Sequence, residues 1–126
     1  MVKALASIAL GATLGAWLRW LLSIKFNALW VVMPLGTYLA NSIAGYIAGL
    51  ALAFFTHWPN LSPEWRLFVL TGFCGALSTF SAFSLEVFES FQHERILYGF
   101  LTIFLHVFTA LAMTYAGYLS YQFLRS

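Results

Sequence analysis

Four long apolar stretches constrain the fold of this chain more than any other feature of its sequence. They run roughly over residues 4–23, 34–55, 65–88 and 96–123. A helix that crosses the hydrocarbon core of a bilayer needs about 20 mostly apolar residues. Only 8% of the 126 residues are charged, whereas soluble domains carry about 25% charged residues. We therefore predict an all-α membrane protein in which residues 1–126 form a single four-span domain within the lipid bilayer.

Short polar segments separate the four stretches, at residues 25–27, 57–64 and 92–95. Pro34 and Pro63 stand where the second and third helices would begin, and proline is tolerated there because the first N–H groups of a helix have no intrahelical partner. The first stretch is longer than a signal-peptide core, and Arg19 stands at its far end in place of a small-residue cleavage site. We interpret this stretch as a retained span.

The positive charges are distributed almost evenly between the two sides of the membrane. Four spans put both termini on one side. That side would hold Lys3, Arg66 and Arg125, and the other would hold Lys25 and Arg95, with Arg19 near it. Because Lys and Arg in short loops set orientation, this balance predicts that copies insert both ways. The net charge of +2 is too small and too scattered to predict binding to nucleic acid.

Small residues recur at helical spacing in the first two stretches. Gly11 and Gly15 form one GxxxG pattern, and Gly45 and Gly49 form another. Ala40, Ala44 and Ala48 add a stripe of small residues to the second stretch. Such patterns let helices approach closely in lipid, so they predict tight packing and leave the activity open.

Two stretches carry polar groups at membrane depth, where unsatisfied groups are costly and usually face protein or water. Asn41 shares a face with Thr37 and Gly45 in the second stretch. Its amide offers two donors to a passing ligand, or it serves only to join helices. The fourth stretch carries a polar stripe made of Thr102, His106 and Thr114, interrupted by Ala110.

The third stretch contains the segment GFCGALSTFSAFSLE, from Gly72 to Glu86. Glycine and hydroxyl residues weaken a helix, so we expect a break near the middle of the membrane. The backbone groups freed there need protein, water or an ion as partner, and broken helices commonly build ion sites in membranes.

Two phenylalanines and two serines follow this expected break. Phe80 and Phe83 fall on one face, and Ser81 and Ser84 form a neighbouring polar stripe. Because the rim of an aromatic ring is electropositive, two rings presented edge-on can receive an anion that hydroxyl and amide groups partly desolvate.

These motifs closely resemble those of the Fluc/CrcB family of fluoride channels. The resemblance is carried by LGAWLRW at Leu14–Trp20, GTYLANSIAG at Gly36–Gly45 and GFCGALSTFSAF at Gly72–Phe83, and it extends over nearly the whole chain. It implies a fluoride-selective channel for passive export, not an enzyme, in the inner membrane of bacteria. It also implies an antiparallel, dual-topology homodimer with two fluoride pathways and a structural sodium ion at its centre.

The resemblance also implies roles for individual residues. The fluoride pathway would be lined by Asn41, Phe80, Phe83, His106 and Thr114, with Ser81 and Ser84 beside it. Arg19 would lie near the vestibule, and the backbone carbonyls of Gly75 and Ser78 would hold the sodium ion. The chain departs from the family pattern at Ala76, Ser78 and Ala82, and Ala110 interrupts the polar track of the fourth stretch. A carbonyl ligand depends little on its side chain, so Ser78 is expected to preserve sodium binding.

Three other functions stay open on the residues alone. A small dual-topology, proton-coupled exporter would use Glu86 as a carboxylate that binds a cation and protons alternately. Glu86 approaches the end of the third stretch, which argues against this role. An enzyme would use His106 as a base for Ser81 or Ser84, but no nucleophile-turn motif is found. A purely structural subunit would not explain the break and its flanking donors.

Overall fold

Helices form nearly the whole chain in the computed structural model, which describes residues 1–126 and contains no strand. Helix α1 spans Val2–Phe26, α2 spans Leu35–His57 and α6 spans Ile96–Arg125. The third span is divided into α3 (Pro63–Arg66), the π-helix η1 (Leu67–Cys74), α4 (Gly75–Leu77) and α5 (Phe80–Gln92). The expectation of an all-α chain with four long apolar helices is confirmed.

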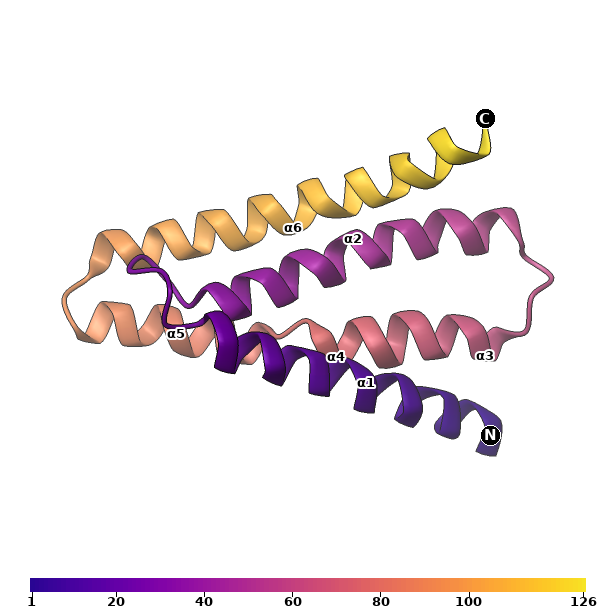
Figure 1. Ribbon diagram of the computed structural model, residues 1–126, viewed down its shortest axis with the longest axis horizontal. Coiled ribbons are helices and arrows are strands. Elements are labelled where there is room, and N and C mark those ends of the chain that lie inside the picture. The colour runs from indigo at the N-terminus through magenta and orange to yellow at the C-terminus, as the bar shows by residue number, and fades with distance from the viewer.

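The spans lie lengthwise beside one another, and both termini are at the same end of the bundle (Figure 1). Helix α2 packs chiefly against α6, while α1 packs against η1, α4 and α2. Pro34 caps the start of α2 and Pro63 is the first residue of α3, as their positions in the sequence predict.

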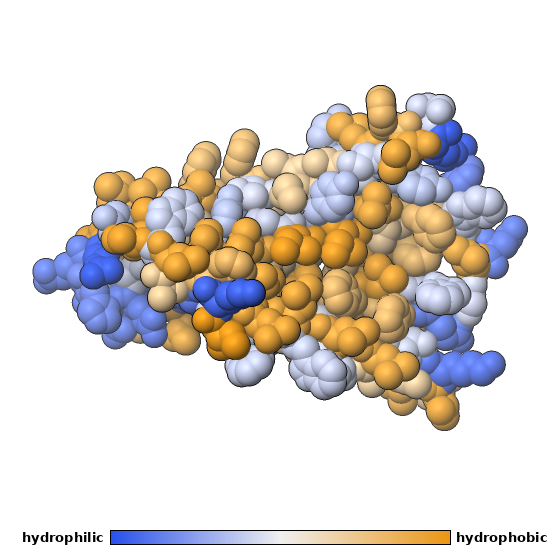
Figure 2. Space-filling model, in the orientation of Figure 1, coloured by the Kyte–Doolittle hydropathy of each residue, from blue (hydrophilic) through white to orange (hydrophobic).

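The surface of the bundle is apolar along its middle. Figure 2 shows hydrophobic residues over most of the central part of this face, with one hydrophilic group among them, and further hydrophilic residues gathered at both ends. Large side chains such as Leu10, Trp17, Phe104 and Leu111 are mostly exposed. Exposed apolar patches of this extent are stable in lipid and not in water, so the chain is a multi-pass membrane protein.

Glycines bring the helices into backbone contact. A Cβ atom at Gly49 would lie 1.9 Å from the carbonyl oxygen of Thr114, and one at Gly117 would lie 2.0 Å from that of Tyr46. A Cβ atom at Gly11 would similarly lie 2.2 Å from the carbonyl oxygen of Phe68. The GxxxG patterns therefore do what their spacing predicts: they let α2 approach α6, and α1 approach η1.

The best-packed part of the interior lies where α1, α2 and α4 meet. Ala40 and Leu77 are fully buried and Ala44 is nearly so. Leu18 and Leu22 of α1 cover this cluster. The cluster fixes the end of α4 against α2, directly before the break in the third span.

The expected break in the third span is confirmed, at two residues with extended backbone. Ser78 has φ −74° and ψ 153°, and Thr79 has φ −149° and ψ 110°. Gly72 and Gly75, which we expected to weaken the helix, are helical themselves. Gly72 instead serves packing, since a Cβ atom there would lie 2.6 Å from the carbonyl oxygen of Ile8.

Candidate functional site at the helix break

Asn41 of α2 holds the break from one side. Its Oδ1 accepts a hydrogen bond from the backbone N–H of Thr79 at 2.6 Å, and its Nδ2 donates to the carbonyl oxygen of Thr79 at 3.3 Å. One side-chain amide thus satisfies both backbone groups of the residue at the break. Unpaired backbone groups are costly inside a membrane, so this contact explains why an extended residue is stable here.

Three further side chains, two at the break and one from α1, satisfy backbone groups on either side of it. Thr79 caps α5, because its Oγ1 accepts from the backbone N–H of Ala82 at 3.1 Å. Ser78 Oγ donates to the carbonyl oxygen of Cys74 at 2.8 Å. Arg19 of α1 donates from Nε to the carbonyl oxygen of Ala76 at 3.0 Å. Arg19, expected near a vestibule, therefore contacts the end of α4.

Two carbonyl groups at the break have no such partner. None of the hydrogen bonds made by turns, loops, caps or side chains ends on the carbonyl oxygen of Gly75 or Ser78. Both residues are exposed on the surface of the single chain. No cluster of three or more His, Cys, Asp or Glu side chains suited to a metal ion is present.

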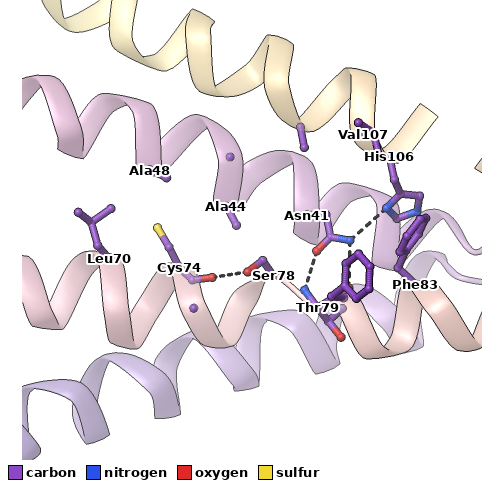
Figure 3. Close-up of a pocket in the computed structure, with 14 residues that line it drawn as sticks. Asn41, Ala44, Ala48, Leu70, Cys74, Ser78, Thr79, Phe83, His106 and Val107 are labelled. Carbon is purple, nitrogen blue, oxygen red and sulfur yellow. Dashed lines mark hydrogen bonds between the residues drawn. The ribbon is translucent and has the colours of Figure 1, made fainter. Parts of the chain in front are cut away.

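A cavity of about 470 Å³ lies at the break and is open to the outside of the chain. We call it the groove. Figure 3 shows its walls, which come from α2, the third span and α6. Its polar lining consists of Asn41, Cys74, Ser78, Thr79 and His106, and its aromatic lining consists of Phe80 and Phe83.

The two phenylalanines occupy different environments although their rings are neighbours. Their ring centroids are 5.4 Å apart, but Phe83 is buried while the side chain of Phe80 is 78% exposed. Phe83 packs beside His106, with ring centroids 4.7 Å apart (Figure 3). Phe80 has no cover from its own chain, so an anion or a second molecule can reach its rim.

His106 is the most buried polar side chain of the groove, with 5% of its surface exposed. Its Nδ1 lies 3.0 Å from Asn41 Nδ2, and its Nε2 is buried without a hydrogen-bond partner. Tyr38 also contacts the imidazole edge-on, at 5.5 Å between ring centroids. The structure therefore brings Asn41, Phe83 and His106 together.

Other predicted site residues lie outside the lining of the groove. Ser81 and Ser84 are exposed on the outer side of α5, and Ser81 Oγ lies 3.5 Å from Thr79 Oγ1. Thr114 is half-buried, and its hydroxyl donates to the carbonyl oxygen of Ala110 in its own helix. Within one chain, the polar stripe of α6 reaches the groove only at His106, with Ala110 beyond it.

Glu86 lies beside Thr37 of α2, one helical turn before Asn41. Its Oε2 accepts from the hydroxyl of Thr37 at 2.6 Å, and its Oε1 is buried without a partner. Glu86 also lines a second cavity of about 340 Å³, together with Asn27, Glu89, His93 and Arg95. The carboxylate thus lies near the bundle end formed by the α1–α2 and α5–α6 connections.

Thr79 and Tyr38 belong to the site although the sequence does not indicate them. Thr79 is the residue that Asn41 binds, and Tyr38 contacts His106. Threonine is favoured directly before the first residue of a helix, because its side chain can accept from an N–H in the first turn. This preference could have identified Thr79 as the start of a new helix. No comparable signal exists for Tyr38, because its contact depends on how α2 packs against α6.

Taken together, four lipid-exposed spans and a polar groove at a helix break define a class of helical membrane proteins with an internal site for small ions. Comparison with known sequences gives the family. Residues 6–118 match the family described as CrcB-like protein, Camphor Resistance (CrcB). The chain belongs to this family.

Curated relatives match nearly the full length of the chain. A protein from Pseudomonas syringae pv. maculicola is 57% identical over 97% of this chain and 96% of its own length. One from Pseudomonas putida (strain W619) is 56% identical over 98% of both chains, and one from Nitrosomonas europaea is 54% identical over 93% of this chain and 92% of its own. All three are named fluoride-specific ion channel FluC.

Proposed function

We propose that this protein is a fluoride-selective ion channel through which fluoride leaves the cell passively. The observation that carries the proposal is the groove, where aromatic rims and nitrogen donors meet at a helix break within the membrane. The relatives named as fluoride-specific channels support the substrate and the class, which is that of channels and not of enzymes. A bacterial inner membrane is the proposed location.

Fluoride is small and strongly hydrated, so a pore must replace its water with other donors. The rims of Phe80 and Phe83 supply electropositive C–H groups, and the polar side chains of the third span and α6 supply N–H and O–H donors. A narrow path lined in this way favours fluoride, because larger anions fit it poorly.

The proposed assembly is a homodimer of two oppositely inserted copies. Gly75, Ser78, Ser81 and Ser84 are exposed on a single chain although they lie in the middle of a membrane span. Polar groups at this depth need protein or water as neighbours. A second copy packed over the groove would supply that cover, and two-fold symmetry would create two equivalent pathways.

A structural sodium ion is proposed at the centre of this dimer. The carbonyl oxygens of Gly75 and Ser78 suit this role, because no hydrogen bond from a turn, loop, cap or side chain ends on them and both residues are exposed toward the proposed partner. Unwound backbone carbonyls are typical ligands for sodium in membrane proteins. The ion would supply a fixed positive charge to the site.

The direct test is efflux from liposomes that contain the purified protein alone. Fluoride should leave rapidly, while chloride under the same gradient should stay inside. Equal efflux of both ions would end the claim of selectivity. Crosslinking in vesicles with cysteines placed on both membrane faces would test the antiparallel dimer.

The alternative function is a proton-coupled exporter that uses Glu86. The buried Oε1 atom without a partner is the observation in its favour. In that case a pH gradient should drive substrate uptake, and Glu86→Gln should abolish this uptake. For a channel, the response of fluoride to a pH gradient should be the same in Glu86→Gln as in the unmodified protein.

A further inference from the structure

The contact between Asn41 and His106 determines which nitrogen of the imidazole carries its proton. The backbone N–H of Thr79 can only donate a hydrogen bond. It donates to the side-chain oxygen of Asn41 at 2.6 Å, so the oxygen and nitrogen of this amide are unambiguously oriented. The NH₂ group of Asn41 then faces the carbonyl oxygen of Thr79 and the Nδ1 atom of His106 (Figure 3).

An amide NH₂ group donates hydrogen bonds and cannot accept them. His106 Nδ1, at 3.0 Å from this group, must therefore offer its lone pair. A neutral imidazole that accepts at Nδ1 carries its proton at Nε2. An imidazolium would have protons on both nitrogens, and this contact with Asn41 would be lost.

Asn41 has no hydrogen left for a ligand in this arrangement. One of its two N–H bonds is directed to Thr79 and the other to His106. By contrast, His106 Nε2 is buried and has no partner in the protein. The side chain as a whole is 5% exposed and belongs to the lining of the groove. A buried donor without a partner is costly, so an acceptor that reaches Nε2 would be favoured.

We propose that Asn41 is a positioning residue that fixes His106 as the Nε2–H tautomer, so that the buried imidazole N–H beside Phe83 is the donor offered to a small anion that passes this ring. This proposal rests on the proposed function for the identity of the anion. Asn41 acts in it through His106 and through the break at Thr79, whereas the sequence suggested that its own amide would contact the ion.

The experiment is nitrogen NMR of the full-length protein in bilayers. The chain has three histidines, so His57→Gln and His93→Gln together leave His106 as the single imidazole. Without fluoride, we expect one neutral tautomer with the proton on Nε2. A proton on Nδ1, or an even mixture of the two tautomers, would overturn the proposal.

A variant of the same shape should reverse the tautomer. In Asn41→Asp, one carboxylate oxygen can still accept from Thr79, but the other now accepts from His106 and favours a proton on Nδ1. Ser42→Ala is the matched control, since the neighbouring Ser42 hydroxyl bonds only to the carbonyl oxygen of Tyr38; it should leave the tautomer unchanged. An unchanged tautomer in folded Asn41→Asp would contradict the positioning role.

A second pair of variants tests the donor without depending on the folding of Asn41→Asp. Gln at position 106 keeps an N–H near the Nε2 position, and Asn keeps one near Nδ1. We expect His106→Gln to conduct fluoride about fivefold faster than His106→Asn, the factor associated with one hydrogen bond. Equal rates, or the reverse order, would count against the assignment.

Fluoride addition separates this proposal from the proposed function. Fluoride should shift the Nε2 resonance of His106, and chloride at the same concentration should not. If vesicles with the unmodified protein move fluoride but the Nε2 resonance is insensitive to it, the assignment of the donor is wrong and the channel function stands. If these vesicles move no fluoride, the proposed function fails, while the fluoride-free spectra still decide the role of Asn41.

Discussion

Helix α2 has two faces that are built from the same kinds of residue and differ in what covers them. On one face, Gly49 is in close backbone contact with Thr114 of α6, and Gly117 of α6 is in close backbone contact with Tyr46. The hydroxyl of Tyr46 also donates to Ser120 at 2.9 Å. We call this contact the seam. On the other face, α2 lines the groove, where Gly75 and Ser78 of the third span are exposed.

The comparison of seam and groove shows that small and hydroxyl residues have no fixed role in a membrane span. Where another helix lies opposite, as in the seam, glycine permits close approach and each hydroxyl is satisfied within the chain. Where no helix of the same chain lies opposite, as in the groove, the same residue types leave a polar hollow. What faces a residue, and not its type, decides whether it stabilises the fold or forms a site.

The largest expected effect comes from adding one methyl group in the seam. In Gly49→Ala the new Cβ would lie 1.9 Å from the carbonyl oxygen of Thr114, so α2 and α6 must separate, at a cost of about 1–3 kcal/mol or more. Thermal unfolding and the yield of monodisperse protein measure this cost. Gly75→Ala is the comparison in the groove, because within one chain its nearest neighbour would be at 3.6 Å; a loss there would report on the proposed dimer contact. Equal losses in both variants in the monomeric protein would remove the distinction between seam and groove.

Replacing an aromatic ring of the groove should reduce transport more than it reduces stability. Phe83→Ile removes the ring beside His106, and we expect fluoride efflux to fall by about tenfold, which corresponds to about 1.4 kcal/mol in the barrier. Phe54→Ile, at the far end of α2 and 38% exposed, should leave efflux unchanged. The comparison is made at equal amounts of folded protein, and similar efflux from both variants would argue against a pathway at Phe83.

Removing the arginine that contacts the break should loosen it. Arg19→Met leaves the carbonyl oxygen of Ala76 without its donor, at a cost of about 1–3 kcal/mol. Hydrogen exchange of the Ser78 and Thr79 amides should therefore accelerate, by about tenfold for 1.4 kcal/mol. Arg125→Met, at the end of α6, serves as control. If exchange at the break stays slow in Arg19→Met, Asn41 alone holds it.

The smallest effect is expected for a hydroxyl that is satisfied within its own helix. Thr102 is 1% exposed and donates to the carbonyl oxygen of Tyr98 at 2.7 Å. Thr102→Val keeps the shape and removes only this bond, so stability should change by about 1 kcal/mol or less, and fluoride efflux should stay the same. A large loss of efflux would mean that the polar stripe of α6 conducts beyond His106.

The sequence predicts those parts of the fold that depend on local composition. Span length, the starts of α2 and α3 at Pro34 and Pro63, and the close approach at Gly11 and Gly49 all follow from hydropathy, backbone chemistry and spacing. The presence of a break follows in the same way. Its position at Ser78 and Thr79 does not, because the amide of Asn41, 38 residues away, stabilises it there.

The candidate site is predictable in composition but not in geometry. The sequence indicates Asn41, Phe83 and His106 as candidates, but their mutual contacts depend on how α2, α5 and α6 pack. The same holds for Phe80 and Phe83, which the sequence treats as equivalent. One is exposed and the other is buried, because only Phe83 faces α6.

The wider winding of η1 between Leu67 and Cys74 gives the third span a place where its length can change by one residue. A π-helix accommodates an additional residue in its turn relative to an α-helix. Deleting one residue from this segment would let the turn tighten to α-helical winding and leave the rings at positions 80 and 83 close to their present orientation, whereas a deletion in a regular α-helix rotates everything after it by about 100°. Natural variation in length should therefore occur in this segment before it occurs in α5, and Gly72 should be retained for its close contact with α1.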